Sequence, residues 1–446
     1  MKDITVIMPL FNAERYLSEA LNSVLCQTYG GFELICINDC STDNTKTILA
    51  DFQKKDKRIK VLENVERLGA GMSRNKGLRE ASGEYVIFLD GDDIFEKELL
   101  EEARNTMEKN GTDIVFFEFM HTSSESIYDK KIKERQKKFV EDYCTIPFSL
   151  SSLDPREVAN WSGATWNKMY RRSFLIDNNI EFQNLPSSND VYFSKMALYS
   201  SKSMIWMDDR RIMVYARDHF EASRISNDRN PMCAYYAMEK LVRELRRRGM
   251  LQECAVFFYC TLVSDMFYVL RHEKNEERKR KFYYYLQNEG IPKCIEYGGE
   301  FYNYADRYDR YILRNFLNNS YESGWIHSYE TYFQFYLKKN GQVVLKFIKD
   351  KQGEKKKIVL WGIGINGKSF LDYLDEHSIR ISAITDIDST KQGNIVNGYE
   401  ILSPENIWKM ADWIITTSKQ VIWDIKDKAI NLGVNQMDVL ELLKKE

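Results

Sequence analysis

Short apolar runs alternate with amphipathic segments over the first part of the chain. Residues 4–11 (ITVIMPLF) form a continuous apolar run, which is typical of a strand buried on both faces of a parallel sheet. Leu17, Leu21 and Val24 then recur at helical spacing. The strand-like pattern returns at residues 32–39, 58–63, 85–90 and 113–119. Strands that alternate with helices over short loops predict an α/β fold, with a parallel sheet and helices on both faces.

The pattern changes after this region. Residues 231–340 look helical and are rich in Tyr, Phe, Arg and Lys, and residues 338–357, heavy in Lys and Gly, resemble a linker. A new βα pattern then begins at KKIVLWGIGINGKSFLDYL. A chain of 446 residues is too long for one ordinary core. We predict an α/β domain over residues 1–230, a helical region with a linker over 231–352, and a Rossmann-like domain over 353–446.

Composition narrows the class of protein. With 43% apolar and 29% charged residues, the chain is typical of a globular protein. Its formal net charge of -2 argues against nucleic acid as a partner of the whole chain. The longest apolar run, near residues 255–263, is soon broken by Asp265, and the N-terminus begins directly in strand-like sequence. We therefore expect neither a membrane span nor a secretory signal, and a cytoplasmic location.

The eight cysteines show no CxxC spacing, and several lie in apolar runs. This usage is typical of reduced core cysteines in a cytoplasmic protein. The sequence also has no HExxH motif or Cys/His cluster that would indicate zinc.

Acidic residues follow two of the predicted strands. Asp39 closes the second strand, and Asp90, Asp92 and Asp93 follow the fourth in FLDGDD. In open parallel sheets, ligands bind at the carboxyl ends of the strands. Clustered carboxylates repel one another unless a cation offsets them, which predicts Mg²⁺ or Mn²⁺ held by one or two carboxylates together with phosphate oxygens. Solvated loop acids or helix N-caps are the alternative for FLDGDD alone.

Several motifs in a fixed order make the assignment more specific. They are MPLFNAERYL, NDCSTDNT, RLGAGMSRNKGL, FLDGDD, WNKMYRRSFL, SSNDVYFSKMAL and MVYARDHFEASRIS. Together they resemble the family 2 glycosyltransferases with the GT-A fold, over roughly residues 1–225. The resemblance implies an inverting, metal-dependent transfer of a sugar from a nucleotide diphosphate donor, by family habit a UDP-sugar. The implied acceptor is a hydroxyl of a glycan, lipid-linked or protein-linked molecule in surface-glycan biosynthesis.

The resemblance also assigns roles at the donor site. Asp39 matches the acid that hydrogen-bonds the donor's base, and Pro9 and Phe11 lie on the loop that flanks the nucleotide. Asp92 matches the acid that coordinates the metal, and Asp90 beside it would contact the nucleotide or the metal shell.

Further positions carry a less specific implication. Arg74 falls where basic or polar residues approach the donor. Arg217, His219 and Ser223 match a segment that often closes over the diphosphate, although exposed polar residues are an equal alternative. Asn38 stands where the family often has an acid, which weakens its match to base recognition.

Asp190 is the candidate catalytic base. An inverting transfer needs a carboxylate that accepts the proton of the attacking hydroxyl. Asp190 in SSNDVYF matches the second acid of the family's Glu-Asp pair, whereas Asn189 stands where Glu is usual. An isolated Asp before an apolar helix is otherwise most often an N-cap.

The C-terminal segment contains GIGINGKS, which satisfies two phosphate-binding patterns. Read as GxGxxG, it uses Gly362, Gly364 and Gly367; read as a P-loop, it adds the following Lys and Ser. Asp386 ends the second strand, as a ribose-binding acid would. The remaining chain is short for a P-loop core, so a Rossmann-like domain with a candidate second nucleotide site is favoured.

Two basic runs, RELRRR and EERKRK, leave two interpretations open. They could dock the protein peripherally on an anionic membrane that holds a lipid-linked acceptor, but solvated helix faces are favoured. The sequence is also compatible with a homo-oligomer.

Two other functions compete with glycosyl transfer. A nucleotide-sugar oxidoreductase or epimerase would need a Tyr-x-x-x-Lys pair after the glycine loop, which is absent. A non-catalytic nucleotide-sugar-binding protein is disfavoured because Asp39, Asp92 and Asp190 are all present. For the C-terminal domain we expect a binding, regulatory or assembly role.

Overall fold

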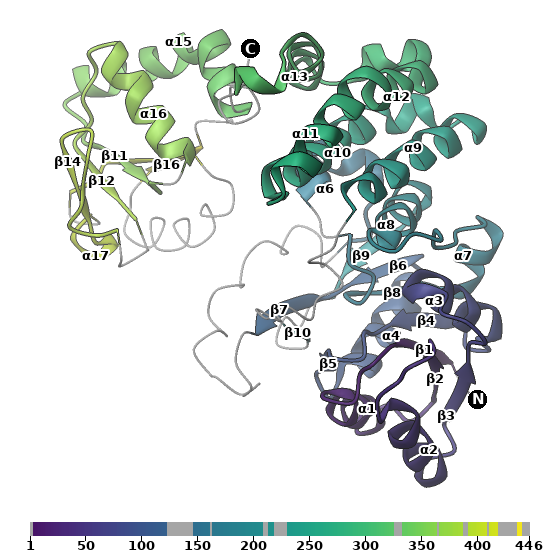
Figure 1. Ribbon diagram of the computed structural model, residues 1–446. Helices are drawn as coiled ribbons and strands as arrows, with labels where there is room; N and C mark the ends of the chain where they lie inside the picture. Colours follow the sequence, from purple (N-terminus) through teal and green to yellow (C-terminus); the bar gives the residue numbers. More distant parts are fainter. Residues whose placement is uncertain are drawn as a thin grey trace. The chain divides into compact units, whose positions relative to one another are not determined.

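The computed structural model shows two compact units, Met1–His327 and Ser328–Glu446 (Figure 1). Within them it describes residues 3–122, 146–160, 163–207, 213–217, 230–324, 332–363, 365–386, 391–407, 410–417 and 435–438.

The first unit is built on a seven-stranded sheet of order β3-β2-β1-β4-β8-β6-β9. The strands are β1 (Ile4–Leu10), β2 (Phe32–Asn38), β3 (Ile59–Glu63), β4 (Tyr85–Phe88), β6 (Ile114–Phe116), β8 (Lys168–Arg171) and β9 (Met204–Trp206). β1 pairs in parallel with β2 and β4, and β2 pairs in parallel with β3. The parallel α/β half predicted from the apolar runs is therefore present.

The sheet is not parallel throughout, and here the sequence-based prediction was wrong. β8 lies between β4 and β6 and runs antiparallel to both. Its sequence, KMYR, has only two apolar residues, so its pattern does not stand out as a buried strand. A separate three-stranded sheet joins β5 (Ile94–Phe95), β10 (Met213–Arg217) and β7 (Glu118–Thr122).

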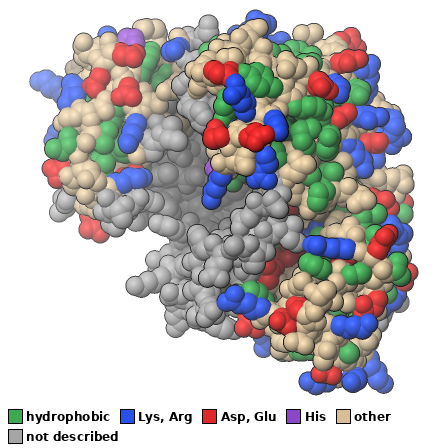
Figure 2. Space-filling view, in the orientation of Figure 1, with side chains coloured by type: hydrophobic (Ala, Val, Ile, Leu, Met, Phe, Trp, Pro, Cys, Tyr) green, Lys and Arg blue, Asp and Glu red, His purple; other side chains and the backbone are tan. Residues whose placement is uncertain are grey.

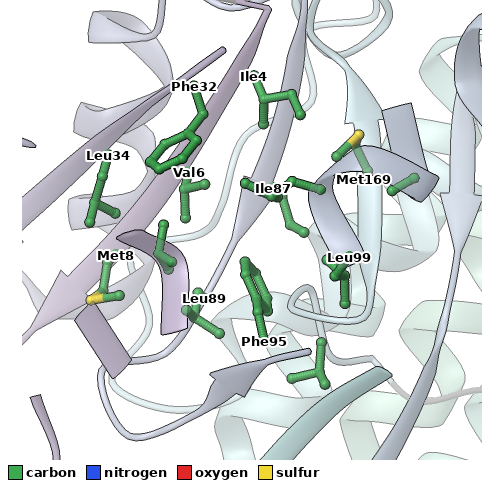
Figure 3. Packing of buried hydrophobic residues seen from close by; sticks show 14 of the residues in the cluster. Ile4, Val6, Met8, Phe32, Leu34, Ile87, Leu89, Phe95, Leu99 and Met169 are labelled. Atoms are coloured by element: carbon green, nitrogen blue, oxygen red, sulfur yellow. The ribbon is translucent and has the colours of Figure 1, made fainter. Parts of the chain in front are cut away.

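Helices cover both faces of the large sheet. On one face, α1 (Leu17–Leu25), α2 (Thr45–Lys55) and α4 (Leu99–Asn110) contribute to a single apolar cluster. Val6 of β1, Leu34 of β2 and Ile87 of β4 point into this cluster (Figure 3). The opposite face is covered by α3 (Gly69–Glu80) and α8 (Asn189–Ser200), where Phe193 packs edge-on against Phe88 of β4.

α3 lies against the sheet at a distance that requires glycine. A Cβ added to Gly77 would lie 2.5 Å from Cγ2 of Ile7 and 3.0 Å from Cδ1 of Ile37. Both isoleucines are fully buried in the central strands, so neither can turn away into solvent.

We expect Gly77→Ala to lower the free energy of unfolding by about 1–3 kcal/mol, because the added methyl overpacks the contact between α3 and the sheet. Chemical denaturation monitored by circular dichroism measures this change. Gly30→Ala is the matched control, because nothing lies within 4 Å of the Cβ added there. Equal stability of both variants would show that α3 does not approach the sheet so closely.

Five α-helices follow the sheet: α9 (Pro231–Arg247), α10 (Leu251–His272), α11 (Glu276–Tyr285), α12 (Ile291–Gly298) and α13 (Arg307–Asn318). They belong to the same compact unit as the sheet, so the predicted boundary at residue 230 does not separate compact units. Tyr199 of α8 and Thr261 of α10 are joined by a buried hydrogen bond of 3.1 Å between their hydroxyls. α10 is long and apolar enough to cross a membrane, but 67% of its apolar window is buried inside the protein, which favours a core helix.

The second unit contains a six-stranded sheet of order β13-β14-β12-β11-β15-β16, parallel except for β13. The strands are β11 (Ile358–Trp361), β12 (Ala383–Thr385), β13 (Ile395–Val396), β14 (Tyr399–Leu402), β15 (Trp413–Thr416) and β16 (Asn435–Asp438), and α16 (Ile365–Glu376) and α17 (Pro404–Ile407) connect some of them.

The predicted linker at residues 338–357 was wrong over most of its length. α15 (Tyr332–Gly353) spans it and belongs to the second unit. Val344, Leu345 and Ile348 of this helix are buried in the same apolar cluster as Phe370 and Leu371 of α16. The lysines on the exposed side of this helix make the segment look like a polar linker when only its composition is considered, although its apolar residues recur on one face.

Candidate functional site

Asp39 lies at the carboxyl edge of the sheet, directly after β2. It is 3% exposed, and its Oδ1 accepts hydrogen bonds from Asn64 Nδ2 (2.7 Å) and from the Leu68 amide (2.8 Å). Its Oδ2 accepts one hydrogen bond, from the Gly69 amide at 2.8 Å. The carboxylate therefore caps the N-terminus of α3, which favours a negative charge there. Since a carboxylate offers about four acceptor positions, Oδ2 retains capacity for a further donor.

Pro9 and Phe11 lie beside Asp39, at the end of β1. Pro9 pairs with Ile37 of β2, and the Asp39 amide donates to the Leu10 carbonyl at 2.8 Å. The guanidinium of Arg67 lies 3.7 Å above the centre of the Phe11 ring. Arg67 was not singled out from the sequence, because nothing in its spacing indicates that it meets Phe11.

The loop after β4 brings the other acids to the same edge. The Leu89 amide donates to the Ile7 carbonyl of β1 at 3.0 Å, which fixes the start of this loop. Asp90 and Asp92 are partly exposed, whereas Asp93 is 4% exposed. The strand pairing β2-β1-β4 thus gathers Asp39, Phe11 and the FLDGDD loop along one edge of the sheet, as the sequence predicted.

Arg74 of α3 connects this loop to the helix that carries Asp190. The side chain is 6% exposed, its Nη2 lies 2.6 Å from Asp90 Oδ1, and its Nη1 donates to Asn189 Oδ1 at 3.1 Å. Asn189 begins α8, and Asp190 follows in the first turn. Arg74 therefore links the predicted donor-side acid Asp90 to Asn189, the residue that directly precedes the predicted base.

Comparison with known proteins bears on this arrangement. Residues 5–202 match the model of glycosyl transferase family 2. The N-terminal part of this chain is therefore similar to the family 2 glycosyltransferases. Residues 354–440 match a second model, described as C2185-like, N-terminal.

Individual relatives resemble parts of the chain. It is 29% identical over 214 residues to poly(ribitol-phosphate) β-N-acetylglucosaminyltransferase TarS of Staphylococcus aureus, covering 47% of this chain and 35% of TarS. It is 43% identical over 104 residues to the putative teichuronic acid biosynthesis glycosyltransferase TuaG of Bacillus subtilis, covering 23% of this chain and 41% of TuaG. The chain thus spans well under half the length of these relatives.

A solved structure supports the fold. The crystal structure of S. aureus TarS 1-349 in complex with UDP-GlcNAc has a TM-score of 0.56 and 23% sequence identity, covering 74% of this chain and 93% of that one. The α/β GT-A fold assigned to the N-terminal part of the chain agrees with this similarity.

Lys168 and Lys195 are buried charged groups, and the Asp190 carboxylate interacts electrostatically with Lys168. Lys168 of β8 donates through Nζ to the Ala164 carbonyl (2.6 Å) and to Asn167 Oδ1 (2.7 Å). The pKa of Lys168 is lowered to about 7, mainly by burial and also by the Lys195 ammonium, while the Asp190 carboxylate acts in the opposite sense. Burial is also the main cause that lowers the pKa of Lys195.

Asp265 of α10 belongs to the same group of charges. Burial raises the pKa of its carboxyl to about 6, the Lys195 ammonium opposes this rise, and the Asp190 carboxylate adds to it. The sequence contained a signal for Asp265, because this acid interrupts the longest apolar run of the chain. By itself, that interruption argues only against a membrane span.

The donor set at the FLDGDD loop fits a metal shared with a ligand. Among the residues that the structure describes, no group of three or more His, Cys, Asp or Glu could hold a metal by itself. Mg²⁺ is commonly held by one or two carboxylates, with substrate phosphates completing the shell. The partly exposed Asp92 beside Asp90 suits such a site.

Other sequence-based assignments reach the limits of the described residues. Arg217 ends β10, but its side chain, like all of His219 and Ser223, lies outside the described part.

In the basic runs, Arg247 pairs with Glu244 at 2.8 Å and Lys281 pairs with Glu277 at 2.6 Å. Basic and acidic side chains are also interspersed on the face shown in Figure 2. These pairs agree with solvated helix faces.

The glycine loop of the second unit joins β11 to α16. Gly362 has φ +91, and a Cβ on Gly367 would lie 2.1 Å from the Gly362 carbonyl oxygen, so both positions require glycine. Gly364 lies outside the described residues. Asp386 follows β12, is 5% exposed, and accepts hydrogen bonds from the Ile363 amide (2.8 Å) and Lys391 Nζ (3.1 Å). The carboxylate of Asp386, the predicted ribose-binding acid, is thus hydrogen-bonded to the backbone of the glycine loop. Nucleotide binding at this loop stays a prediction.

Proposed function

We propose that this chain is an inverting, metal-dependent glycosyltransferase that moves a sugar from a nucleotide diphosphate donor, a UDP-sugar, to an acceptor hydroxyl. The observation that carries the proposal is the gathering of Asp39 and the FLDGDD loop at the carboxyl ends of β2 and β4, on either side of β1, in a region that matches the family 2 model. Arg74 joins Asp90 of this loop to Asn189, which directly precedes Asp190, the acid that would activate an acceptor.

Each residue has a distinct role in this proposal. Asp39 and Phe11 would hold the base of the donor, by a hydrogen bond and by ring contact. Asp190 would accept the proton of the acceptor hydroxyl as the hydroxyl attacks the anomeric carbon. A divalent ion, Mn²⁺ or Mg²⁺, held by Asp92 would neutralise charge on the departing diphosphate.

The relatives favour a surface glycan as the product. TarS is named for transfer of N-acetylglucosamine to poly(ribitol-phosphate), and TuaG for teichuronic acid biosynthesis. A third relative, 29% identical over 262 residues, is the cholesterol galactosyltransferase of Borreliella burgdorferi. We therefore propose a glycan, lipid-linked or protein-linked acceptor, with the enzyme in the cytoplasm. The second unit would act in binding, regulation or assembly.

A panel of nucleotide sugars tests the proposal. We expect release of free nucleotide from one donor, dependent on Mn²⁺ or Mg²⁺ and abolished by EDTA. The competing functions give different results: an oxidoreductase or epimerase would alter the sugar with the nucleotide still attached, and a binding protein would hold the donor without releasing nucleotide. Either result would overturn the proposal.

A further inference from the structure

Arg74 and Asn189 form a contact whose role goes beyond donor binding. Both halves of the Arg74 guanidinium are committed inside the protein, one to Asp90 and one to Asn189. The Cζ atom lies 5.3 Å from the centre of the Phe182 ring, and Nε is buried without a hydrogen-bond partner among the described residues. A guanidinium held in this way resembles an internal strut more than a free ligand-binding group.

The two segments that the strut joins are in close contact. α3 and α8 lie next to each other (Figure 1). A Cβ on Gly71 of α3 would lie 2.8 Å from the Gln183 carbonyl oxygen and 3.0 Å from the Cβ of Asn189. This approach brings the first turn of α8 within reach of Arg74.

A second set of contacts fixes the chain that leads into α8. Asn75 Nδ2 donates to the Phe182 carbonyl at 3.0 Å, and the Phe182 amide donates back to Asn75 Oδ1 at 2.8 Å. The Phe182 ring stacks on Phe193 of α8, with centroids 4.0 Å apart and planes 7° apart. Arg74 thus adds a charged contact to a joint between α3 and α8 that otherwise consists of the Asn75–Phe182 hydrogen bonds and the stacked rings of Phe182 and Phe193.

We propose that Arg74 and Asn189 are positioning residues, which set the place of Asp190 relative to the FLDGDD loop. This inference rests on the proposed function for the role of Asp190, but the joint itself does not. Because Asn189 is neutral, Arg74 retains a single carboxylate partner here, Asp90, and Asn189 contributes only an acceptor oxygen. Asn189, which stands where the family usually has Glu, therefore keeps the hydrogen bond to Arg74. It also leaves Asp190 as the carboxylate in the first turn of α8.

Four variants test the joint. Asn189→Ala removes the acceptor oxygen, and Arg74→Lys keeps the charge beside Asp90 but cannot reach both partners with one fork. Asn189→Asp keeps an isosteric acceptor and is the rescue variant. Ser187→Ala is the matched control, because the Ser187 hydroxyl is buried in the same loop and has no hydrogen-bond partner among the residues that the structure describes.

The first readout is hydrogen exchange of peptides covering residues 186–196 in the full chain, which needs no substrate. We expect Asn189→Ala and Arg74→Lys to speed exchange at the start of α8 about tenfold, because a hydrogen bond to a charged group is lost. Asn189→Asp and Ser187→Ala should behave like the wild type. Unchanged exchange in both Asn189→Ala and Arg74→Lys would overturn the proposal.

The second readout separates positioning from donor contact, with UDP-GlcNAc as the probe. We expect Asn189→Ala to lower kcat for UDP release about 10- to 100-fold and to change KM less than about twofold. Asn189→Asp should restore turnover, with its acid limb moved to higher pH because a second negative charge stands beside Asp190. A loss of UDP affinity in step with turnover would instead make Arg74 a donor contact. If the wild type releases no UDP, the UDP form of the proposed function fails, and hydrogen exchange alone decides the joint.

Discussion

Asp92→Ala should abolish the metal-dependent release of nucleotide from the sugar donor, by about 10³-fold or more. Asp90 and Asp92 are the partly exposed acids of the FLDGDD loop, and Asp90 is paired with Arg74, whereas Asp93 is buried. Without the Asp92 carboxylate the divalent metal would not be held, and the negative charge on the departing diphosphate would not be neutralised. Steady-state assays over a range of Mn²⁺ concentrations measure the effect.

The control for this variant is Asp51→Ala, because Asp51 is an exposed acid of α2 whose side chain contacts Lys54 at 3.4 Å. It should keep wild-type turnover and the same response to metal. If Asp92→Ala retained turnover at ordinary Mn²⁺ concentrations, Asp92 would not be the metal-holding residue, and the metal would have to be assigned elsewhere.

Asp190→Asn should lower sugar transfer about 10²- to 10⁴-fold while leaving donor affinity near that of the wild type. The amide keeps the size of the carboxylate but cannot accept the proton of the attacking hydroxyl. Calorimetric titration with the donor nucleotide and a turnover assay on the same sample separate the two properties.

The surroundings of Asp190 provide a check on this variant. The Asp190 charge raises the pKa of Lys168, and burial lowers it. Removing that charge should therefore lower the pKa of Lys168 further.

Normal turnover of Asp190→Asn would refute its assignment as the base, and a parallel loss of donor affinity would indicate a binding role.

The sequence predicted the part of the fold that long apolar runs define. The strands at residues 4–11, 32–39, 58–63 and 85–90 are present within one or two residues. Their parallel pairing is what brings Asp39 and the FLDGDD loop to one edge, so this half of the site followed from the pattern.

The rest could not be predicted because it depends on contacts distant in the chain. The antiparallel strand β8 is short, and the apolar stripe of α15 lies among lysines. The bond between Arg74 and Asn189 joins residues 115 positions apart, and it exists because Gly71 lets two helices meet. The position of Asp265 depends on the packing of α10, which no local pattern reveals.

The placement of Asp265 has a consequence for how this chain could be shortened or recombined. The helices after the sheet supply Asp265, the acid that offsets the charge of the buried ammonium group of Lys195. A version that ended after β10, or that exchanged these helices for unrelated ones, would leave cationic groups uncompensated in a dry interior, which is strongly unfavourable. The helical segment should therefore be kept together with the sheet in any shortened or recombined version of this unit.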